Sequence, residues 1–439
     1  NFIYRQHKYC PTVVPRMTVP PSRATRISAR RAALKGHLSM DTDCTLDSCP
    51  AYGLGRKALI VYLAFLSAFT PLSTDLFLPA LPIMAEYFQA TPGLTNLTLM
   101  GFMFFFALSM LVWGPLSDKY GRRPVILAGL TLYLLSSVMC ALSSDIWMLI
   151  GGRVIQATGS GAVSAVAMAI TKDVFRGRTM ENVLTTIQTM MLIAPMIAPV
   201  LGGFLLALSS WRGIFWAFVI CGVVAWLGLL PLRESLERPT EGPALKSLGR
   251  IAFVLGHGRF SALLAVFSVA SMPIMVFLAT SAYVYQRSFG VSPQMYSAFF
   301  CANALASVLG PTLYPRVLRE LPQRGLITAC FAAVAAGSAL LLLFGHAGPF
   351  WFAALMLPVT FCSTAIRPPS TIILMTMLDS DTGTVASLIG SAAVLCGSFA
   401  MLVSGLWTDP LVSTAVISLF AGLFCLAGWL ILGRNAKRG

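Results

Sequence analysis

Long apolar runs separated by short polar gaps make up most of the chain after residue 57. Each run is close to the ~20 mostly apolar residues that a helix needs to cross a membrane. The short alternating segments that form membrane β-barrels are not seen in the sequence. The pattern predicts an all-α integral membrane protein with twelve transmembrane helices, at 57–79, 97–116, 124–143, 146–170, 184–208, 212–232, 260–284, 296–317, 325–345, 349–377, 383–405 and 411–433.

One longer polar stretch divides these runs six and six, so two six-helix bundles are expected. The halves also echo each other, because Gly114-Pro115 ends the second run and Gly310-Pro311 ends the eighth. Parallel repeats of this kind build the central cavity of one large class of transporters. The predicted organisation is a basic, disordered tail, a bundle, a linker, a second bundle and a short tail, at 1–57, 58–232, 233–259, 260–433 and 434–439.

Composition agrees with a lipid environment. Hydrophobic residues make up 57% of the 439 residues and charged residues only 11%, whereas soluble domains carry about 25% charged residues. The formal net charge of +15 raises the alternative of a nucleic-acid partner. The placement of the basic residues argues against it, because most of them lie in the N-terminal tail or in short gaps between apolar runs.

The distribution of Lys and Arg also predicts the orientation of the spans. If the N-terminus is cytoplasmic, seventeen of these residues lie in the cytoplasmic gaps and C-terminal tail. Only Arg212 and Arg287 lie in the outer gaps. By the positive-inside rule, both termini are expected in the cytoplasm.

Neither the N-terminal tail nor the cysteines indicate a functional site. Residues 1–57 lack the apolar core of a secretory signal. Met40 opens a short leader, so residues 1–39 are interpreted as upstream translation or a disordered tail, with a mitochondrial-type targeting segment as the alternative. The ten cysteines show no CxxC or Cys/His ligand spacing, so neither a metal site nor a disulfide framework is expected.

The loop after the second run reads GPLSDKYGRRP, beginning at Gly114. Gly114 and Gly121 allow helices and a tight turn to approach closely. Asp118 can pair with Arg122 or Arg123, or it can cap the helix that follows. The sequence therefore predicts a charged latch on the inner face.

The fourth run carries Arg153 and Gln156 about one turn apart. An arginine this far inside an apolar run is costly and needs a partner or water. The alternative is that Arg153 extends to the membrane surface. Its position about seven residues inside the run favours a functional role.

The fifth run carries Pro195, Pro199, Gly202 and Gly203. Two prolines four residues apart remove two helical donors on one face, and the glycine pair allows close helix contact. Such a helix can bend, and it suits the seam between the two halves.

These three patterns resemble motifs A, B and C of the major facilitator superfamily, and the resemblance extends over 58–433. In that family the motif B arginine is linked to proton transfer, and motif C is the antiporter signature. Ala198 stands where the commoner motif C has glycine, and together with STDLFLPALP from Ser73 it resembles the Bcr/CflA drug-resistance exporters. The resemblance implies the major facilitator fold, proton-coupled multidrug efflux, antibiotic resistance and a bacterial inner membrane.

Asp75 is the only carboxylate near the interior of a predicted span. A carboxyl group taken out of water favours its neutral form, so Asp75 could hold a proton on one side of the membrane and release it on the other. The alternative is a helix-end carboxylate solvated at the outer rim. The resemblance favours a proton-coupling role for Asp75 and Arg153.

Arg367 lies deep within the tenth span, before Pro368-Pro369. Either the prolines break the helix and Arg367 reaches cytoplasmic water, or it faces the cavity and favours anionic or carbonyl-rich substrates. Lipophilic substrates need aromatic, soft apolar and a few polar groups in the cavity wall. The further candidates for substrate contact are Phe102, Phe106, Gln188, Met191, Tyr283 and Asn303.

The sequence as a whole predicts a monomeric, proton-coupled transporter that exports small amphiphilic or drug-like molecules by alternating access. Its partners are expected to be the solute, protons and lipid, with no cofactor. The alternative in the same fold is a transporter for one metabolite, such as a nucleoside, a sugar or an amino acid. A membrane-bound enzyme is disfavoured because no catalytic dyad is visible in the spans, and a receptor because the motif set is that of transporters.

Overall fold

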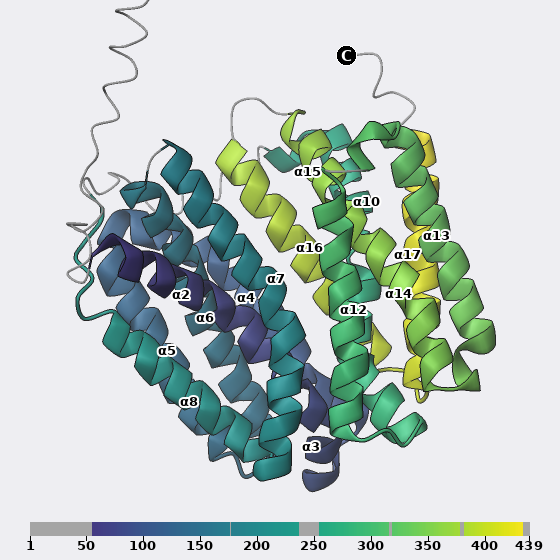
Figure 1. The fold of residues 1–439 in the computed structure, drawn as a ribbon, viewed down its shortest axis with the longest axis horizontal. Coiled ribbons are helices and arrows are strands. Elements are labelled where there is room, and N and C mark those ends of the chain that lie inside the picture. The colour runs from purple at the N-terminus through teal and green to yellow at the C-terminus, as the bar shows by residue number, and fades with distance from the viewer. Residues whose placement is uncertain (1–54, 176, 237–253, 316–317, 378–381, 433–439) are drawn as a thin grey trace, which may run out of the picture. The chain divides into compact units, whose positions relative to one another are not determined.

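The computed structural model describes residues 55–175, 177–236, 254–315, 318–377 and 382–432. The tail at 1–54, most of the linker, Asp379, Asp381 and the tail after 432 lie outside the described residues. In the described part, eleven helical stretches are long and apolar enough to cross a membrane, and α16 adds a shorter apolar helix. The all-helical fold with twelve spans in two bundles is therefore confirmed (Figure 1).

The first span of the N-terminal half runs over Arg56–Tyr87 and is not one continuous helix. The first helix stops at Asp75 instead of residue 79, and the chain then turns through a short 3-10 segment at Leu78–Ala80. Pro79 and Pro82 lack the N–H groups that a continuing helix needs. The elements of this half are α2 (Arg56–Asp75), η1 (Leu78–Ala80), α3 (Leu81–Tyr87), α4 (Pro92–Tyr120), α5 (Arg122–Ala141), α6 (Ile146–Val174), α7 (Gly177–Leu208) and α8 (Trp211–Gly228).

The C-terminal half differs from the prediction in two spans, each of which is made of two helices. The seventh breaks after Val269, before Pro273, and the tenth breaks at Ile366, before Pro368-Pro369. The elements are α10 (Gly258–Val269), α11 (Met272–Tyr283), η2 (Val284–Ser288), α12 (Pro293–Leu313), η3 (Leu318–Glu320), α13 (Gln323–Phe344), η4 (Gly345–Ala347), α14 (Pro349–Ala365), α15 (Arg367–Met375), α16 (Thr382–Ser404) and α17 (Pro410–Leu432).

The two halves contact each other mainly through α4 with α16 and α7 with α12. Glycines permit the first contact, because a Cβ on Gly93 would lie 2.5 Å from the carbonyl oxygen of Gly405. In the second, Ser297 donates a hydrogen bond of 2.7 Å to the carbonyl of Pro199. Both contacts lie toward the end of the bundles that carries α3, which we call the α3 end (Figure 1).

Two further polar contacts join the halves at the α3 end. The Gln286 side chain donates to the Pro79 carbonyl at 3.1 Å. Arg287 forms an ion pair with Glu86 at 3.5 Å, with both side chains exposed. The α3 end therefore holds the halves together by polar contacts as well as by packing.

Candidate functional site

Asp75 is the last residue of α2, and only 4% of its surface is exposed. It is the only buried carboxylate among the described residues. The Thr74 hydroxyl donates a hydrogen bond of 2.9 Å to its Oδ1. Asp75 is therefore enclosed by protein and is not a solvated residue at the rim. A buried acid with one neutral donor is poorly compensated when it is ionised.

Arg153 on α6 is fully buried, which excludes a side chain extended to the membrane surface. Its Nη1 donates to Gln156 Oε1 at 2.5 Å, and its Nη2 donates to the Ser73 carbonyl at 2.9 Å. The guanidinium carbon lies 4.3 Å from the ring centres of both Phe77 and Phe102. Carbonyl dipoles and ring faces thus stabilise this cation in place of a carboxylate.

Asp75 and Arg153 are connected through the last turn of α2. Arg153 holds the backbone carbonyl of Ser73, two residues before Asp75, and the Ser73 hydroxyl lies 2.6 Å from the hydroxyl of Tyr133. Gln156 in turn donates to Ser137 Oγ at 2.7 Å. The turn that carries the acid is therefore fixed to α5 and α6.

The sequence did not reveal Ser73, Phe77, Tyr133 and Ser137 as partners of this network. Phe77 and Ser73 lie close to Asp75 in the sequence, but the two residues on α5 carry no sequence signal. They are brought to Arg153 only by the packing of α5 on α6.

The loop between α4 and α5 forms the predicted ion pair and adds two acids. Arg122 bonds to Asp118 at 2.5 Å, and also to Asp173 at the end of α6 at 2.9 Å. The acid that caps α5 is not Asp118 but Glu234, whose carboxylate accepts from the backbone N–H of Arg122 at 2.8 Å and of Arg123 at 3.1 Å. A carboxylate at a helix N-terminus is favourable. The latch thus joins α4, α5, α6 and the segment after α8.

Gly121 connects α4 to α5 with a φ of 100°, a conformation that residues with a Cβ rarely adopt. A Cβ there would also lie 2.7 Å from Glu234 Oε2. On Gly114, by contrast, a Cβ would meet no atom within 4 Å outside its own helix. Of the two motif glycines, only Gly121 is required by the geometry of this conformation.

The glycines Gly202 and Gly203 allow α7 to pack closely where the two halves meet. Gly202 faces the carbonyl of Leu76, directly after Asp75, so closely that no side chain would fit. Gly203 faces Ser297 and Pro293 of the other half. Helix α7, with Pro195 and Pro199 inside it, therefore contacts the turn after the buried acid and the second bundle at once.

The substrate-contact candidates lie in different environments. Phe102, Phe106, Tyr283 and Asn303 are buried within the bundles: the two phenylalanines stack at 6.4 Å, and Asn303 accepts from Thr360 at 3.0 Å. They do not line an open surface here. Met191 is 39% exposed, and Arg367 is exposed and lines a cavity. The side chain of Gln188 lies outside the described residues, and a substrate contact stays a prediction for all of them.

Comparison with known proteins identifies the family to which the chain belongs. Residues 63–401 match the model of the Major Facilitator Superfamily. An uncharacterized MFS-type transporter of Bacillus subtilis, YdgK, is 29% identical over 79% of this chain and 88% of its own length. The multidrug resistance protein MdtL of Escherichia coli O9:H4 is 28% identical over 63% of this chain and 71% of its own length.

A solved structure shows the same fold. The D-xylose-proton symporter superposes with a TM-score of 0.64, covering 84% of this chain and 97% of the symporter, at 14% sequence identity. That likeness concerns the fold alone.

Proposed function

Because the chain belongs to the major facilitator superfamily, and so is a multi-pass membrane transporter and not an enzyme, we propose that it exports small amphiphilic molecules in exchange for protons. The observation that carries the proposal is that Asp75 and Arg153 are both buried and that neither forms an ion pair within the described part of the chain. The two are joined through the turn at Ser73. The similarity to multidrug resistance protein MdtL supports the export of drug-like solutes. Ala198 and the stretch from Ser73 support the Bcr/CflA branch.

In an alternating-access cycle, Asp75 is the group that binds and releases the proton. Protonated Asp75 lowers the affinity for solute when the site faces outward, and release of the proton inside restores that affinity. One pH unit is worth about 1.4 kcal/mol, and 100 mV adds about 2.3 kcal/mol per charge. A thousandfold solute gradient costs about 4.1 kcal/mol, so one or two protons are sufficient.

The orientation of the protein in the membrane is also part of this proposal. Charge counting favours a cytoplasmic N-terminus, and the resemblance to the Bcr/CflA exporters supports a bacterial inner membrane. The α3 end then faces outward. The polar contacts between the halves gather at the α3 end. In this orientation the structure represents an inward-facing state, from which solute would be loaded. The protein is proposed to act as a monomer.

The test uses proteoliposomes with an acidic lumen and a panel of two lipophilic probes, the cation tetraphenylphosphonium and the anion 2-naphthoate. The wild type is expected to accumulate at least one probe, and Asp75→Asn is expected to lose this gradient-driven accumulation while it still exchanges probe across the membrane. Removing the carboxyl group removes the only buried acid of the described residues, and with it the proton carrier.

Glu86→Gln is the matched control, because Glu86 is an exposed carboxylate at the same α3 end. It should retain accumulation. Accumulation that survives in Asp75→Asn would move the coupling site elsewhere. A wild type that transports one sugar, nucleoside or amino acid and neither probe would favour the metabolite transporter instead.

A further inference from the structure

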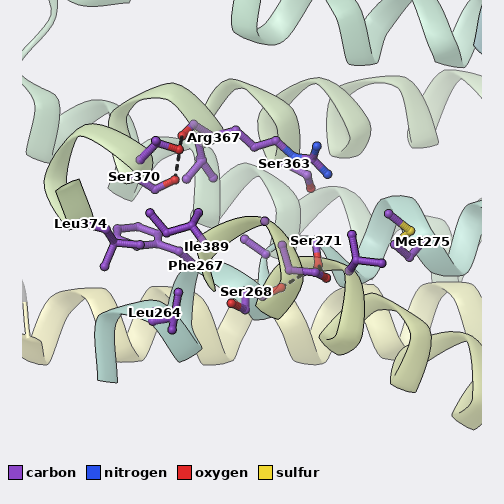
Figure 2. Close-up of a pocket in the computed structure, with 16 residues that line it drawn as sticks. Leu264, Phe267, Ser268, Ser271, Met275, Ser363, Arg367, Ser370, Leu374 and Ile389 are labelled. Carbon is purple, nitrogen blue, oxygen red and sulfur yellow. Dashed lines mark hydrogen bonds between the residues drawn. The ribbon is translucent and has the colours of Figure 1, made fainter. Parts of the chain in front are cut away.

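A cavity within the C-terminal half lies apart from the buried charges of the first half. Its volume is about 310 Å³, at the lower end of the roughly 300–1,000 Å³ of small-molecule sites. Its walls come from α10 and α11 of one broken span, from α14 and α15 of the other, and from α16 (Figure 2). The chain breaks thus border a space large enough for a small solute.

Among the residues that the structure describes, Arg367 is the only charged one that lines this cavity. It begins α15 and lies eight residues before the end of that helix at Met375, about 12 Å along the helix axis at 1.5 Å per residue. Arg367 is an exposed residue, and no ion pair with it is present among the described residues. A cation at this depth needs a compensating anion or water.

Ser363 provides a second unsatisfied donor in the same place. Only 4% of Ser363 is exposed, and its Oγ has no hydrogen-bond partner. Ser363 and Arg367 line the same cavity, and they overlap in the view of Figure 2. Three other hydroxyls of the lining have acceptors, because Ser271 donates to the Ala393 carbonyl, and Ser370 and Thr371 both donate to the Arg367 carbonyl. A buried hydroxyl without a partner is costly, so its natural complement is an acceptor that enters the cavity.

The remaining walls suit an apolar group. Leu264, Phe267, Met275 and Ile389 contribute aliphatic, aromatic and thioether surface. On the α16 side, a Cβ added at Gly390 would meet no atom within 4 Å. The cavity therefore combines one cationic corner with an apolar space.

We propose that Arg367 and Ser363 form the subsite for a carboxylate of an amphiphilic solute, whose apolar body lies against the surrounding side chains. Guanidinium pairs with carboxylate in a two-point hydrogen-bonded geometry, and the serine hydroxyl supplies a further donor. This inference rests on the proposed function and narrows it, because it makes the preferred solutes of this transporter anionic.

The experiment measures binding to the purified full chain by equilibrium dialysis, with 2-naphthoate and its neutral isostere 2-naphthamide as probes. The wild type should bind the anion at least about tenfold more tightly than the amide, the value of one hydrogen bond to a charged group. Arg367→Gln should remove this preference, and Arg367→Lys should keep part of it. Ser363→Ala should weaken binding of the anion, whereas the matched control Ser370→Ala should not, because that hydroxyl is already bound within its own helix.

A steric variant tests the location independently of charge. Gly390→Leu fills the open space on α16 and should weaken both naphthalene probes together. Equal binding of both probes by the wild type, or an undiminished preference for the anion in Arg367→Gln, would overturn the proposal.

An anionic lipid headgroup has the same charge as the carboxylate of a solute. A second experiment with lipid therefore distinguishes these two ligands. In nanodiscs of phosphatidylcholine with or without phosphatidylglycerol, binding of 2-naphthoate should persist in both. Complete displacement by phosphatidylglycerol would contradict a solute site. Binding does not depend on proton coupling, so the two proposals fail separately. Accumulation that survives in Asp75→Asn contradicts the proton-coupling role of Asp75, whereas equal binding of the two probes by the wild type contradicts the subsite at Arg367.

Discussion

At the scale of single residues, the first half is organised around a buried arginine whose two terminal nitrogens have different acceptors. Nη1 bonds to Gln156 and Nη2 to the Ser73 carbonyl, while the planar group lies between Phe77 and Phe102. The forked, planar group makes all of these contacts at once, which a compact ammonium cannot do. The identity of Arg153, and not only its charge, is therefore required.

We expect Arg153→Lys to lower the thermal stability of the purified protein even though the charge is kept. A lysine reaches one acceptor at most, and each buried acceptor left unpaired costs about 1–3 kcal/mol. Loss of tryptophan fluorescence on heating measures the shift in Tm.

Arg56→Lys is the control for this change, because Arg56 also lies over an aromatic ring, that of Phe175, but at the start of a span. Surface substitutions of this kind change stability by about 0.5 kcal/mol or less. Equal Tm values for wild type and Arg153→Lys would show that charge alone is sufficient at this position.

At the scale of elements, the apolar runs predicted the helices well, but they did not predict where helices end or break. An apolar run shows only that a segment is hydrophobic. The stretches around Asp75 and Ile366 are as apolar as their surroundings, although prolines end the helices there. The sequence identified the pair of Asp118 with an arginine because four residues separate the partners. It did not identify Glu234, more than one hundred residues away, because only the fold brings that cap to α5.

A helix cap at the α3 end makes stability depend on pH. Asp409 accepts from the backbone N–H of Leu411 at 2.8 Å and of Val412 at 3.3 Å, and it pairs with His346 at 2.8 Å. Partial burial raises the pKa of Asp409, but these hydrogen bonds outweigh it and hold the pKa below its ordinary value of 3.8. A carboxyl group with a lowered folded pKa stabilises the fold above its unfolded pKa and loses that contribution as pH falls through the folded value.

We therefore expect the thermal stability of the wild type to fall below about pH 4 more steeply than that of Asp409→Asn, which keeps the cap but cannot ionise. Melting curves between neutral and acidic pH measure the difference. Parallel curves for the two proteins would mean that the Asp409 carboxylate contributes nothing. Asp409→Ala, which also loses the cap, should cost about 1 kcal/mol at neutral pH.

At the scale of the whole molecule, the two bundles are joined at the end opposite the charged latch. The latch ties α4, α5 and α6 of one bundle to the segment after α8, whereas the contacts between bundles lie toward α3. A rocking motion must break the second set while it preserves the packing within each bundle, because packed cores move as units. The polar contacts at the α3 end can be exchanged for water, and the close packing of Gly93 against Gly405 must separate as well.

The ion pair of Arg287 with Glu86 offers a direct test of this motion, because both side chains are exposed and 3.5 Å apart across the two halves. In a background without native cysteines, Glu86→Cys combined with Arg287→Cys should cross-link rapidly with a short bismaleimide. The cross-linked protein should lose gradient-driven accumulation of probe, since the α3 end can no longer open. Each single cysteine variant, treated identically, should stay active, because a surface ion pair of this kind contributes only about 0–1 kcal/mol. Full transport by the cross-linked double variant would mean that the halves need not separate at this end. Alternating access by rocking of the two bundles would then be wrong for this protein, while the buried charges could still carry the proton.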